Sequence, residues 1–152
     1  TGCVATFART WVTDPTCTRF VITMAQAVAL VRVALDAMAG GEVFVPVLPA
    51  AALMDLASAV LTEVTPWQRI QLRPGGEKTH EQLLTDEEVG LTVVVPTPSL
   101  PGEAVYVLTP SLPTWTTQEW TGASLPAGMV YRSDVCPWRV GPDELRTLLR
   151  EG

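Results

Sequence analysis

One helical segment, from Thr23 to Met38, constrains the fold of this chain more than any other stretch. Thr23 and Gln26 stand at the two positions of an N-terminal capping box, and Gly40-Gly41 follows as a glycine stop. Between these signals, apolar residues recur at helical spacing: Met24, Val28, Val31, Leu35 and Met38. Alanines and Leu30 widen this stripe until most of the helix surface is apolar, and such a helix has to be covered. We therefore expect the stripe through Val28, Val31 and Leu35 to belong to the core.

Strands and helices both follow this first helix. Residues 42–46 and 67–72 have the composition of short strands, and between them Pro49 begins a helix that runs to about Leu61. Strand, helix and strand with short connections predict a right-handed βαβ unit. A short helix is expected through His80, Glu81 and Leu83. The fold class predicted is α/β, a βαβ unit with extra helices and short strands.

The second half of the chain is richer in proline. Asp86-Glu87-Glu88 has the acidic character of a helix start, and strands are expected at 92–95 and 104–108. Proline-rich loops at 96–101 and 110–126 follow these strands, and a terminal helix begins near Gly141. We expect one domain over residues 1–152, because this length hardly allows two. Residues 1–18 form an irregular lead-in, 19–90 an α/β core, and 91–152 the remaining strands, loops and terminal helix.

The net charge and the apolar pattern argue against nucleic-acid and membrane partners, and the cysteine content indicates the compartment. The chain carries a net charge of −6, and Lys78 is its only lysine, so it has no basic stripe for nucleic acid. Its longest apolar stretch, 24–38, is interrupted by polar residues, and its first residues lack a secretory signal, so no membrane association is expected. Three cysteines far apart in the sequence favour free thiols and a reducing compartment, hence the cytoplasm.

Several familiar site motifs are missing from the sequence. There is no Gly-x-Gly-x-x-Gly fingerprint, no phosphate-binding P-loop and no Tyr-x-x-x-Lys pair. One histidine and three dispersed cysteines give no zinc spacing. The sequence leaves open a Cys–His nucleophile that uses His80, although no motif brings a cysteine to it.

One ordered set of short motifs remains. In chain order it comprises Thr13-Asp14-Pro15, Thr18-Arg19-Phe20, Thr23 and Gln26, Gly41-Glu42-Val43-Phe44-Val45-Pro46, Asp55-Leu56-Ala57, Arg73-Pro74-Gly75-Gly76-Glu77-Lys78 with His80-Glu81, Tyr131-Arg132-Ser133-Asp134, and the terminal helix around Glu144-Leu145. This order resembles the C-terminal part of the nucleotide-sugar 4,6-dehydratases of polysaccharide biosynthesis. These are extended short-chain dehydrogenases/reductases that typically act on UDP-N-acetylglucosamine. The resemblance covers essentially the whole chain, with weaker stretches at 1–11 and 96–126.

The resemblance implies a substrate-binding role without complete catalysis. In that family the N-terminal half holds the NAD(P) fingerprint and the catalytic tyrosine and lysine. By similarity this chain binds a UDP-sugar or related nucleotide, binds no cofactor alone, and meets NAD(P) only if an N-terminal partner exists. The residues that the resemblance places at the UDP end are Arg19, Arg73, Gly75, Gly76, Glu77 and Lys78.

Elementary chemistry agrees with this assignment. Arginine offers a diphosphate a planar bidentate donor, and glycines let backbone N–H groups approach a phosphate. Glu77 is suited to accept a hydrogen bond from a ribose hydroxyl. The sequence also departs from the family, whose loop usually reads Arg-Pro-Gly-Glu-Lys-Leu-His-Glu: here one glycine is extra and Thr79 replaces the leucine. Val47 stands where the family commonly has lysine, and Cys136 stands near a customary asparagine.

Structural alternatives stay open for the same residues. On pattern alone Arg73 is predicted to be a plain surface arginine, and the resemblance favours the ligand role instead. Arg19 is equally a candidate for an ion pair with Asp14 or Asp36. His80 is expected to satisfy a backbone group at a helix start. Trp115 and Trp120 are candidates either for stacking on a base or, more commonly, for a small cluster under a long loop.

Three functions fit these residues and the resemblance. The chain is half of a split enzyme completed by an N-terminal partner chain, a stand-alone nucleotide-binding module, or a structural protein that reuses the fold as a homo-oligomer. Under all three, we expect the face that the cofactor domain covers in the family to be apolar.

Overall fold

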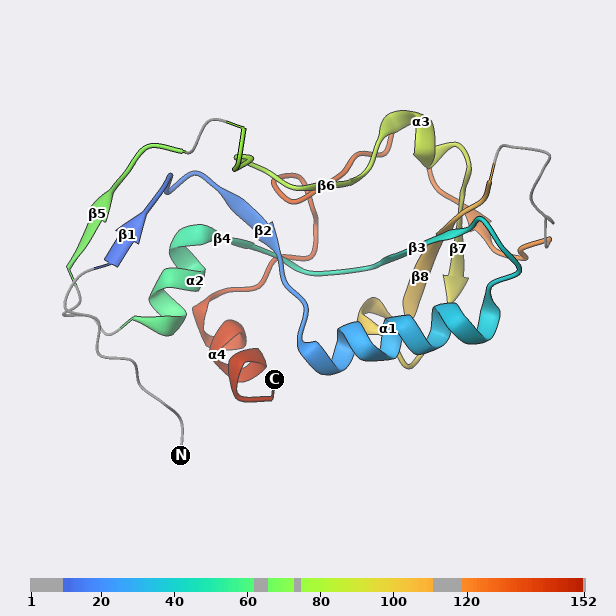
Figure 1. The fold of residues 1–152 in the computed structure, drawn as a ribbon, viewed down its shortest axis with the longest axis horizontal. Coiled ribbons are helices and arrows are strands. Elements are labelled where there is room, and N and C mark those ends of the chain that lie inside the picture. Colours follow the sequence, from blue (N-terminus) through green and yellow to red (C-terminus); the bar gives the residue numbers. More distant parts are fainter. Residues whose placement is uncertain (1–9, 62–65, 73–74, 111–118, 152) are drawn as a thin grey trace. The chain divides into compact units, whose positions relative to one another are not determined.

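A computed structural model describes residues 10–61, 66–72, 75–110 and 119–151 of the chain. It confirms a mixed α/β fold, in which short sheets and helices alternate along the chain (Figure 1). The elements group into two compact units, each assembled from segments far apart in the sequence. The first unit comprises Thr1–Thr23, Pro49–Glu81 and Ser133–Gly152, and the second comprises Met24–Leu48 and Gln82–Arg132.

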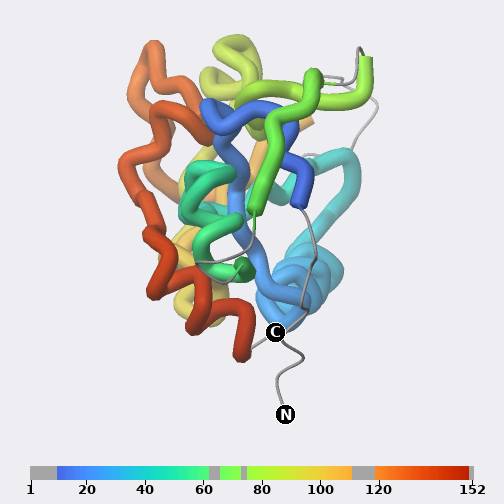
Figure 2. The backbone as a smooth tube through the Cα atoms, turned by 90° about the vertical axis from the view of Figure 1, so that its left-hand side faces the viewer, coloured from blue at the N-terminus to red at the C-terminus, as the bar shows by residue number. Residues whose placement is uncertain are grey.

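The first unit contains two small sheets and two helices. Strand β1 (Thr10–Val12) pairs in parallel with β5 (Trp67–Arg69), and β2 (Thr18–Phe20) pairs antiparallel with β4 (Ala50–Ala52). Helix α2 (Leu53–Val60) packs against helix α4 (Pro142–Glu151), so the green and red helical segments of this unit lie side by side in Figure 2. Its buried centre consists of Ala51, Val140 and Leu145, with Val21, Leu56 and Ala59 packed around them.

The second unit is built on a four-stranded antiparallel sheet. Its strand order is β3 (Val43–Pro46), β8 (Ala104–Leu108), β7 (Thr92–Pro96) and β9 (Ala123–Ser124). Helix α1 (Met24–Ala37) covers this sheet; α3 (Asp86–Val89), a short 3-10 helix (Pro101–Glu103) and the pair of β6 (Gln82–Leu84) with β10 (Tyr131–Arg132) complete the unit. The core holds Leu100, Val105 and Val107, and Phe44 meets Trp120 edge-on there, with 5.5 Å between ring centroids. Trp120 thus belongs to a packed cluster, whereas Trp115 lies outside the described residues.

Most expected elements are present. The first helix, the strands at 43–46, 92–96 and 104–108, and the terminal helix are confirmed. The acidic helix start at Asp86 is also confirmed, with a full capping box between Thr85 and Glu88. The expected 110–126 loop contains the short strand β9 in its described part.

The connections between elements differ from the expected βαβ unit. Strand β3 pairs with β8, whereas the parallel partner of β5 is β1, so the strands on either side of α2 lie in different sheets. Helix α2 begins at Leu53 because Ala50–Ala52, which carries no strand signature, pairs with β2. The short helix expected through His80–Leu83 is also wrong: Gln82–Leu84 is strand β6.

Helix α1 shows the largest departure from expectation. The stripe predicted to be core is exposed: Met24 is 72%, Val28 51%, Val31 57%, Leu35 64% and Met38 54% accessible. The side that packs on the sheet core carries Ala29, Leu30 and Val33 instead. Because the helix is apolar on nearly every side, its periodicity alone did not reveal which side faces the sheet.

Among the helices of the described residues, none combines the length and the apolar character needed to cross a lipid bilayer.

Candidate functional site

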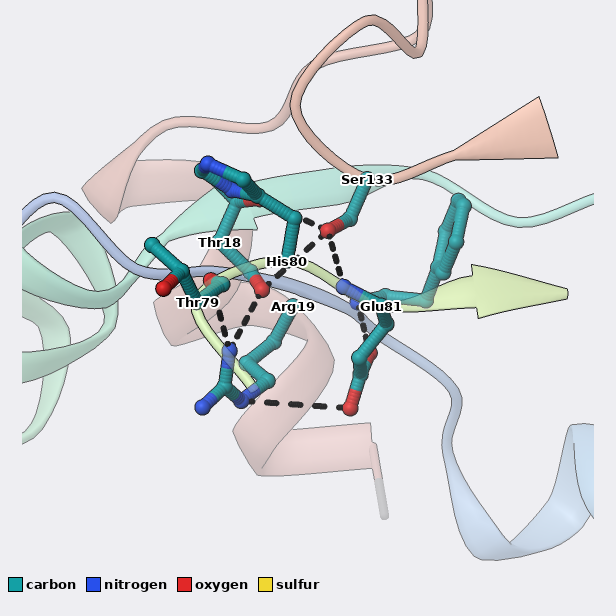
Figure 3. A network of polar contacts seen from close by, with 7 residues as sticks. Thr18, Arg19, Thr79, His80, Glu81 and Ser133 are labelled. Atoms are coloured by element: carbon teal, nitrogen blue, oxygen red, sulfur yellow. Dashed lines mark hydrogen bonds and ion pairs between the residues drawn. The ribbon is translucent and has the colours of Figure 1, made fainter. Parts of the chain in front are cut away.

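A buried network of polar side chains ties three distant segments of the first unit together (Figure 3). The hydroxyls of Thr18 and Ser133 lie 2.6 Å apart, and Thr18 Oγ1 is 2.9 Å from His80 Nδ1. Ser133 Oγ also accepts the backbone N–H of Glu81 at 2.9 Å and donates to the carbonyl of Thr18 at 3.1 Å. Ser133 and Thr18 are both buried, so this network fixes the 79–81 segment against β2.

Arg19 lies at the edge of this network. Its Nη1 donates to the carbonyls of Thr18 at 2.7 Å and Thr79 at 3.1 Å. Its Nε lies 3.8 Å from Glu81 Oε1, while the other carboxylate oxygen of Glu81 accepts the Phe20 backbone N–H at 2.7 Å. Arg19 is therefore bound to the 79–81 segment, which follows directly on the expected nucleotide loop.

Two expectations about ion pairs and caps are corrected here. The carboxylate partner of Arg19 is Glu81, whereas Asp14 pairs with Arg69 at 3.0 Å. The ring of His80 bonds the Thr18 hydroxyl rather than a backbone group at a helix start. The long sequence separation of these partners explains why spacing along the chain did not predict them.

The expected nucleotide loop reaches the surface next to this network. Gly75 and Gly76 are exposed, and Gly75 adopts φ +73°, a left-handed conformation that glycine tolerates without strain. Lys78 is exposed, and Glu77 is half-buried. Arg73 lies outside the described residues. Whether Arg19, Gly75, Gly76, Glu77 and Lys78 contact a ligand stays a prediction.

An apolar cleft of about 480 Å³ lies between β1 and α2 and is open to solvent. Glu77 is the only carboxylate among the described residues that line it. The other lining residues are Thr10, Trp11 and Val12 of β1, Thr13 directly after it, Leu53, Leu56, Ala57 and Val60 of α2, and Leu61 directly after that helix. Trp11 is 56% exposed, so its ring is accessible to a ligand. Trp11 was not predicted as a site residue, and its only sequence signal is a large aromatic placed just before the Thr-Asp-Pro turn.

A second, more polar hollow of about 390 Å³ shares Thr13 with this cleft. It is lined by Thr13, Asp14, Arg69 and residues 70–72. The backbone N–H of Thr16 and then its hydroxyl lower the pKa of Asp14 below its usual 3.8; burial opposes them and Arg69 adds to them. Asp14 is thus held as a carboxylate that closes the turn after β1.

The rest of the described chain offers few groups for metal binding or for nucleophilic catalysis. No group of three or more histidine, cysteine, aspartate or glutamate side chains in the described ranges is placed to hold a metal ion. Cys17 and Cys136 are both buried, and the Cys136 thiol donates to the Trp138 carbonyl at 3.4 Å. The first unit thus brings together an aromatic ring, an apolar wall and a carboxylate at one cleft, with an exposed glycine-containing loop on the same unit.

Comparison with known proteins matches residues 5–98, more than half of the chain, to the family described as "Polysaccharide biosynthesis protein". The UDP-N-acetylglucosamine 4,6-dehydratase (inverting) of Campylobacter jejuni serotype O:2 is 32% identical over 101 residues, which are 66% of this chain and 28% of that protein. An uncharacterized membrane protein of Methanocaldococcus jannaschii is 34% identical over 87 residues, 51% of this chain and 26% of that protein. The chain thus spans about a quarter of the length of these relatives.

The fold has a solved counterpart. The X-ray structure of Pen from Bacillus thuringiensis superposes with a TM-score of 0.78 and 27% sequence identity. The match covers 97% of this chain and 41% of the Pen chain.

Proposed function

Because the chain belongs to the polysaccharide biosynthesis protein family, we propose that it is the nucleotide-sugar-binding portion of a 4,6-dehydratase-like protein. The cleft of the first unit carries this proposal, since it combines an aromatic ring, an apolar wall and a carboxylate. Similar proteins from Campylobacter jejuni are named as dehydratases of UDP-N-acetylglucosamine, which makes a UDP-sugar the first ligand to test.

The cleft suits the nucleoside end of such a ligand. Its volume of about 480 Å³ falls within the usual range for small-molecule sites. A base stacks on Trp11 while the apolar side chains of α2 cover its other side, and stacking of this kind is worth about 1–3 kcal/mol per base. Glu77 accepts a hydrogen bond from a ribose hydroxyl. Together these groups supply both apolar area and orientation.

The diphosphate is assigned to the loop that follows. Exposed Gly75 and Gly76 leave room for phosphate oxygens to approach backbone N–H groups, and Lys78 adds a positive charge. Arg73, outside the described residues, is the proposed bidentate donor. In this proposal Arg19 also faces the ligand's UDP end; its Nη1 holds the Thr79 carbonyl, so it fixes the loop's position as well.

The proposal assigns binding, and not dehydration, to this chain. Its sequence contains neither the Gly-x-Gly-x-x-Gly fingerprint that would hold NAD(P) nor a Tyr-x-x-x-Lys pair. The residues present do not fit the cofactor, and an N-terminal partner would have to supply that chemistry. We propose a reducing compartment, the cytoplasm, for the protein, since its three cysteines lie far apart in the sequence.

Isothermal titration calorimetry with UDP, UDP-N-acetylglucosamine and NAD tests the proposal. Both uridine nucleotides should bind and NAD should not. Trp11→Ala should weaken UDP binding by about 1–3 kcal/mol, the value of one stacked base. Glu77→Gln should cost about 1 kcal/mol, because an amide oxygen is a weaker acceptor than a carboxylate.

Two matched variants provide the controls. Trp67→Ala removes a similarly exposed tryptophan from the neighbouring strand, and Glu87→Gln neutralises an exposed glutamate on α3. Neither residue lines the cleft. Absence of uridine nucleotide binding by the wild-type chain, or equal losses in Trp11→Ala and Trp67→Ala, would contradict the proposed site.

A further inference from the structure

The polar hollow of the first unit lies at the carboxyl ends of two parallel strands. Strands β1 and β5 are paired as far as Val12 and Arg69, and the backbone N–H of Ile70 still donates to the Val12 carbonyl at 2.9 Å. The hollow is lined by the residues that follow these two strand ends. Thr13 lines both the hollow and the apolar cleft, so the two cavities adjoin and a ligand in the cleft can extend past Thr13 into the hollow.

Arg69 is an oriented hydrogen-bond donor in the wall of this hollow. Its Nη2 donates to Asp14 Oδ2 at 3.0 Å. The other carboxylate oxygen, Asp14 Oδ1, accepts the Thr16 backbone N–H at 2.9 Å and the Thr16 hydroxyl at 2.8 Å. A carboxylate held by its own turn thus orients the guanidinium. A guanidinium has five N–H donors and no acceptor, so Arg69 keeps further donors for a ligand.

The paired charges of the hollow favour a neutral group over a phosphate. The Asp14 carboxylate lines the same hollow as Arg69, and it repels an anion placed there. An uncharged group with a hydrogen-bond acceptor gains the bond from Arg69 without that repulsion. The base of a nucleotide is such a group.

We propose that the hollow recognises the edge of a uracil base, and that Arg69 makes the chain prefer uridine over cytidine nucleotides. The inference rests on the proposed function, which stacks the base on Trp11 and bonds the ribose to Glu77. Position 4 of a pyrimidine lies across the ring from N1, the atom that carries the ribose. It is therefore the end of the base that extends past Thr13 into the hollow.

The two pyrimidines differ at this position in the property that Arg69 distinguishes. Uracil carries a carbonyl oxygen there, which accepts a hydrogen bond, whereas cytosine carries an amino group, which donates. Arg69 has only donors, so it bonds uracil and opposes cytosine. Gln71, in the same wall, does not distinguish the two bases, because its amide has both a donor and an acceptor and can rotate to pair with either.

Isothermal titration calorimetry of the intact chain with UDP and CDP tests the inference. The wild type should bind UDP at least about tenfold more tightly than CDP, since a hydrogen bond from a charged donor is worth about that factor or more. Arg69→Met keeps an unbranched side chain and removes the donors, so it should weaken UDP binding by about tenfold and leave CDP binding unchanged. Gln71→Leu should weaken the binding of both nucleotides by the same factor.

Arg146→Met is the matched control. Arg146 is also an exposed arginine of the first unit that pairs with an aspartate, Asp143, and it is not among the described residues that line the cleft or the hollow. It should change neither affinity. Circular dichroism should show that both arginine variants are folded, since the replaced side chains are 64% and 45% exposed.

Two results would overturn the inference and leave the proposed nucleotide site intact. One is equal affinity of the wild type for UDP and CDP. The other is an equal loss of both affinities in Arg69→Met, which would assign Arg69 to the diphosphate that the two ligands share. If the wild type binds neither nucleotide, this inference and the proposed function are both wrong.

Discussion

The two units of this chain are stabilised in different ways. In addition to its apolar cluster of Ala51, Val140 and Leu145, the first unit has a hydrogen-bonded network in which Ser133 and Thr18 bury their hydroxyls and join segments more than 50 residues apart. The second unit depends on an apolar sheet-and-helix core and leaves a row of apolar side chains outside it. The difference teaches that polar contacts hold the segment beside the candidate binding loop, whereas the second unit leaves a row of apolar side chains exposed along one helix.

The largest expected effect is the difference in stability loss between a buried and an exposed leucine of the second unit. Leu100→Ala should lower the free energy of unfolding by about 2–5 kcal/mol, because Leu100 is buried and its removal leaves a cavity. Leu35→Ala should change it by less than about 0.5 kcal/mol, because Leu35 is exposed. Urea unfolding of both variants measures the difference. Similar losses would mean that α1 buries the side of the helix that the structure shows exposed.

A smaller effect should come from the polar network of the first unit. Ser133→Ala removes a hydroxyl that accepts from the Glu81 backbone N–H and bonds to Thr18, and it leaves the buried Thr18 hydroxyl and the half-buried Glu81 N–H without that partner. We expect a loss of about 1–3 kcal/mol in urea unfolding. Ser99→Ala, at an exposed turn of the second unit, is the control and should be neutral. A neutral Ser133→Ala would mean that the network adds nothing to stability.

The smallest expected effects depend on pH. Burial raises the pKa of Glu42, but backbone N–H groups of Gly40, Glu42 and Ala39 and the Trp120 indole outweigh it, so the pKa lies below its usual 4.5. In the first unit, Thr16 and Arg69 lower the pKa of Asp14. A lowered folded-state pKa stabilises the fold above the unfolded-state value, and this contribution disappears as the pH falls through the folded-state value.

Glu42→Gln and Asp14→Asn should therefore each flatten the loss of stability below about pH 4.5 without steepening it elsewhere. Thermal unfolding between neutral and acidic pH, with Glu87→Gln as the exposed control, measures this. An unchanged acid limb in both variants would show that neither carboxylate is linked to folding.

The sequence predicted an element correctly where its residue pattern was compatible with only one local structure. Valine-rich strands 92–96 and 104–108 and the acidic helix start at Asp86 are local signals, and they form as predicted. The predictions failed where a residue pattern was equally compatible with two structures. Helix α1 is apolar on both sides, and Ala50–Ala52 suits a helix or a strand until β2 pairs with it.

The candidate site was predicted only in part, for a related reason. The loop at Gly75–Lys78 and Arg19 could be identified by their resemblance to a family motif, and Glu77 indeed lines a cleft. Trp11 and the hydroxyl pair of Thr18 and Ser133 belong to the site region through contacts between distant segments. No spacing along the chain encodes such contacts, so only the folded structure reveals them.

Nitrogen-15 NMR of the five tryptophan indole N–H groups during titration with UDP tests the central claim most directly. We predict saturable shifts of the Trp11 resonance, assigned with Trp11→Phe, and no shift of Trp138, which does not line the cleft. UDP binding that leaves Trp11 unshifted, or no binding at all, would contradict the claim that this cleft receives the nucleotide.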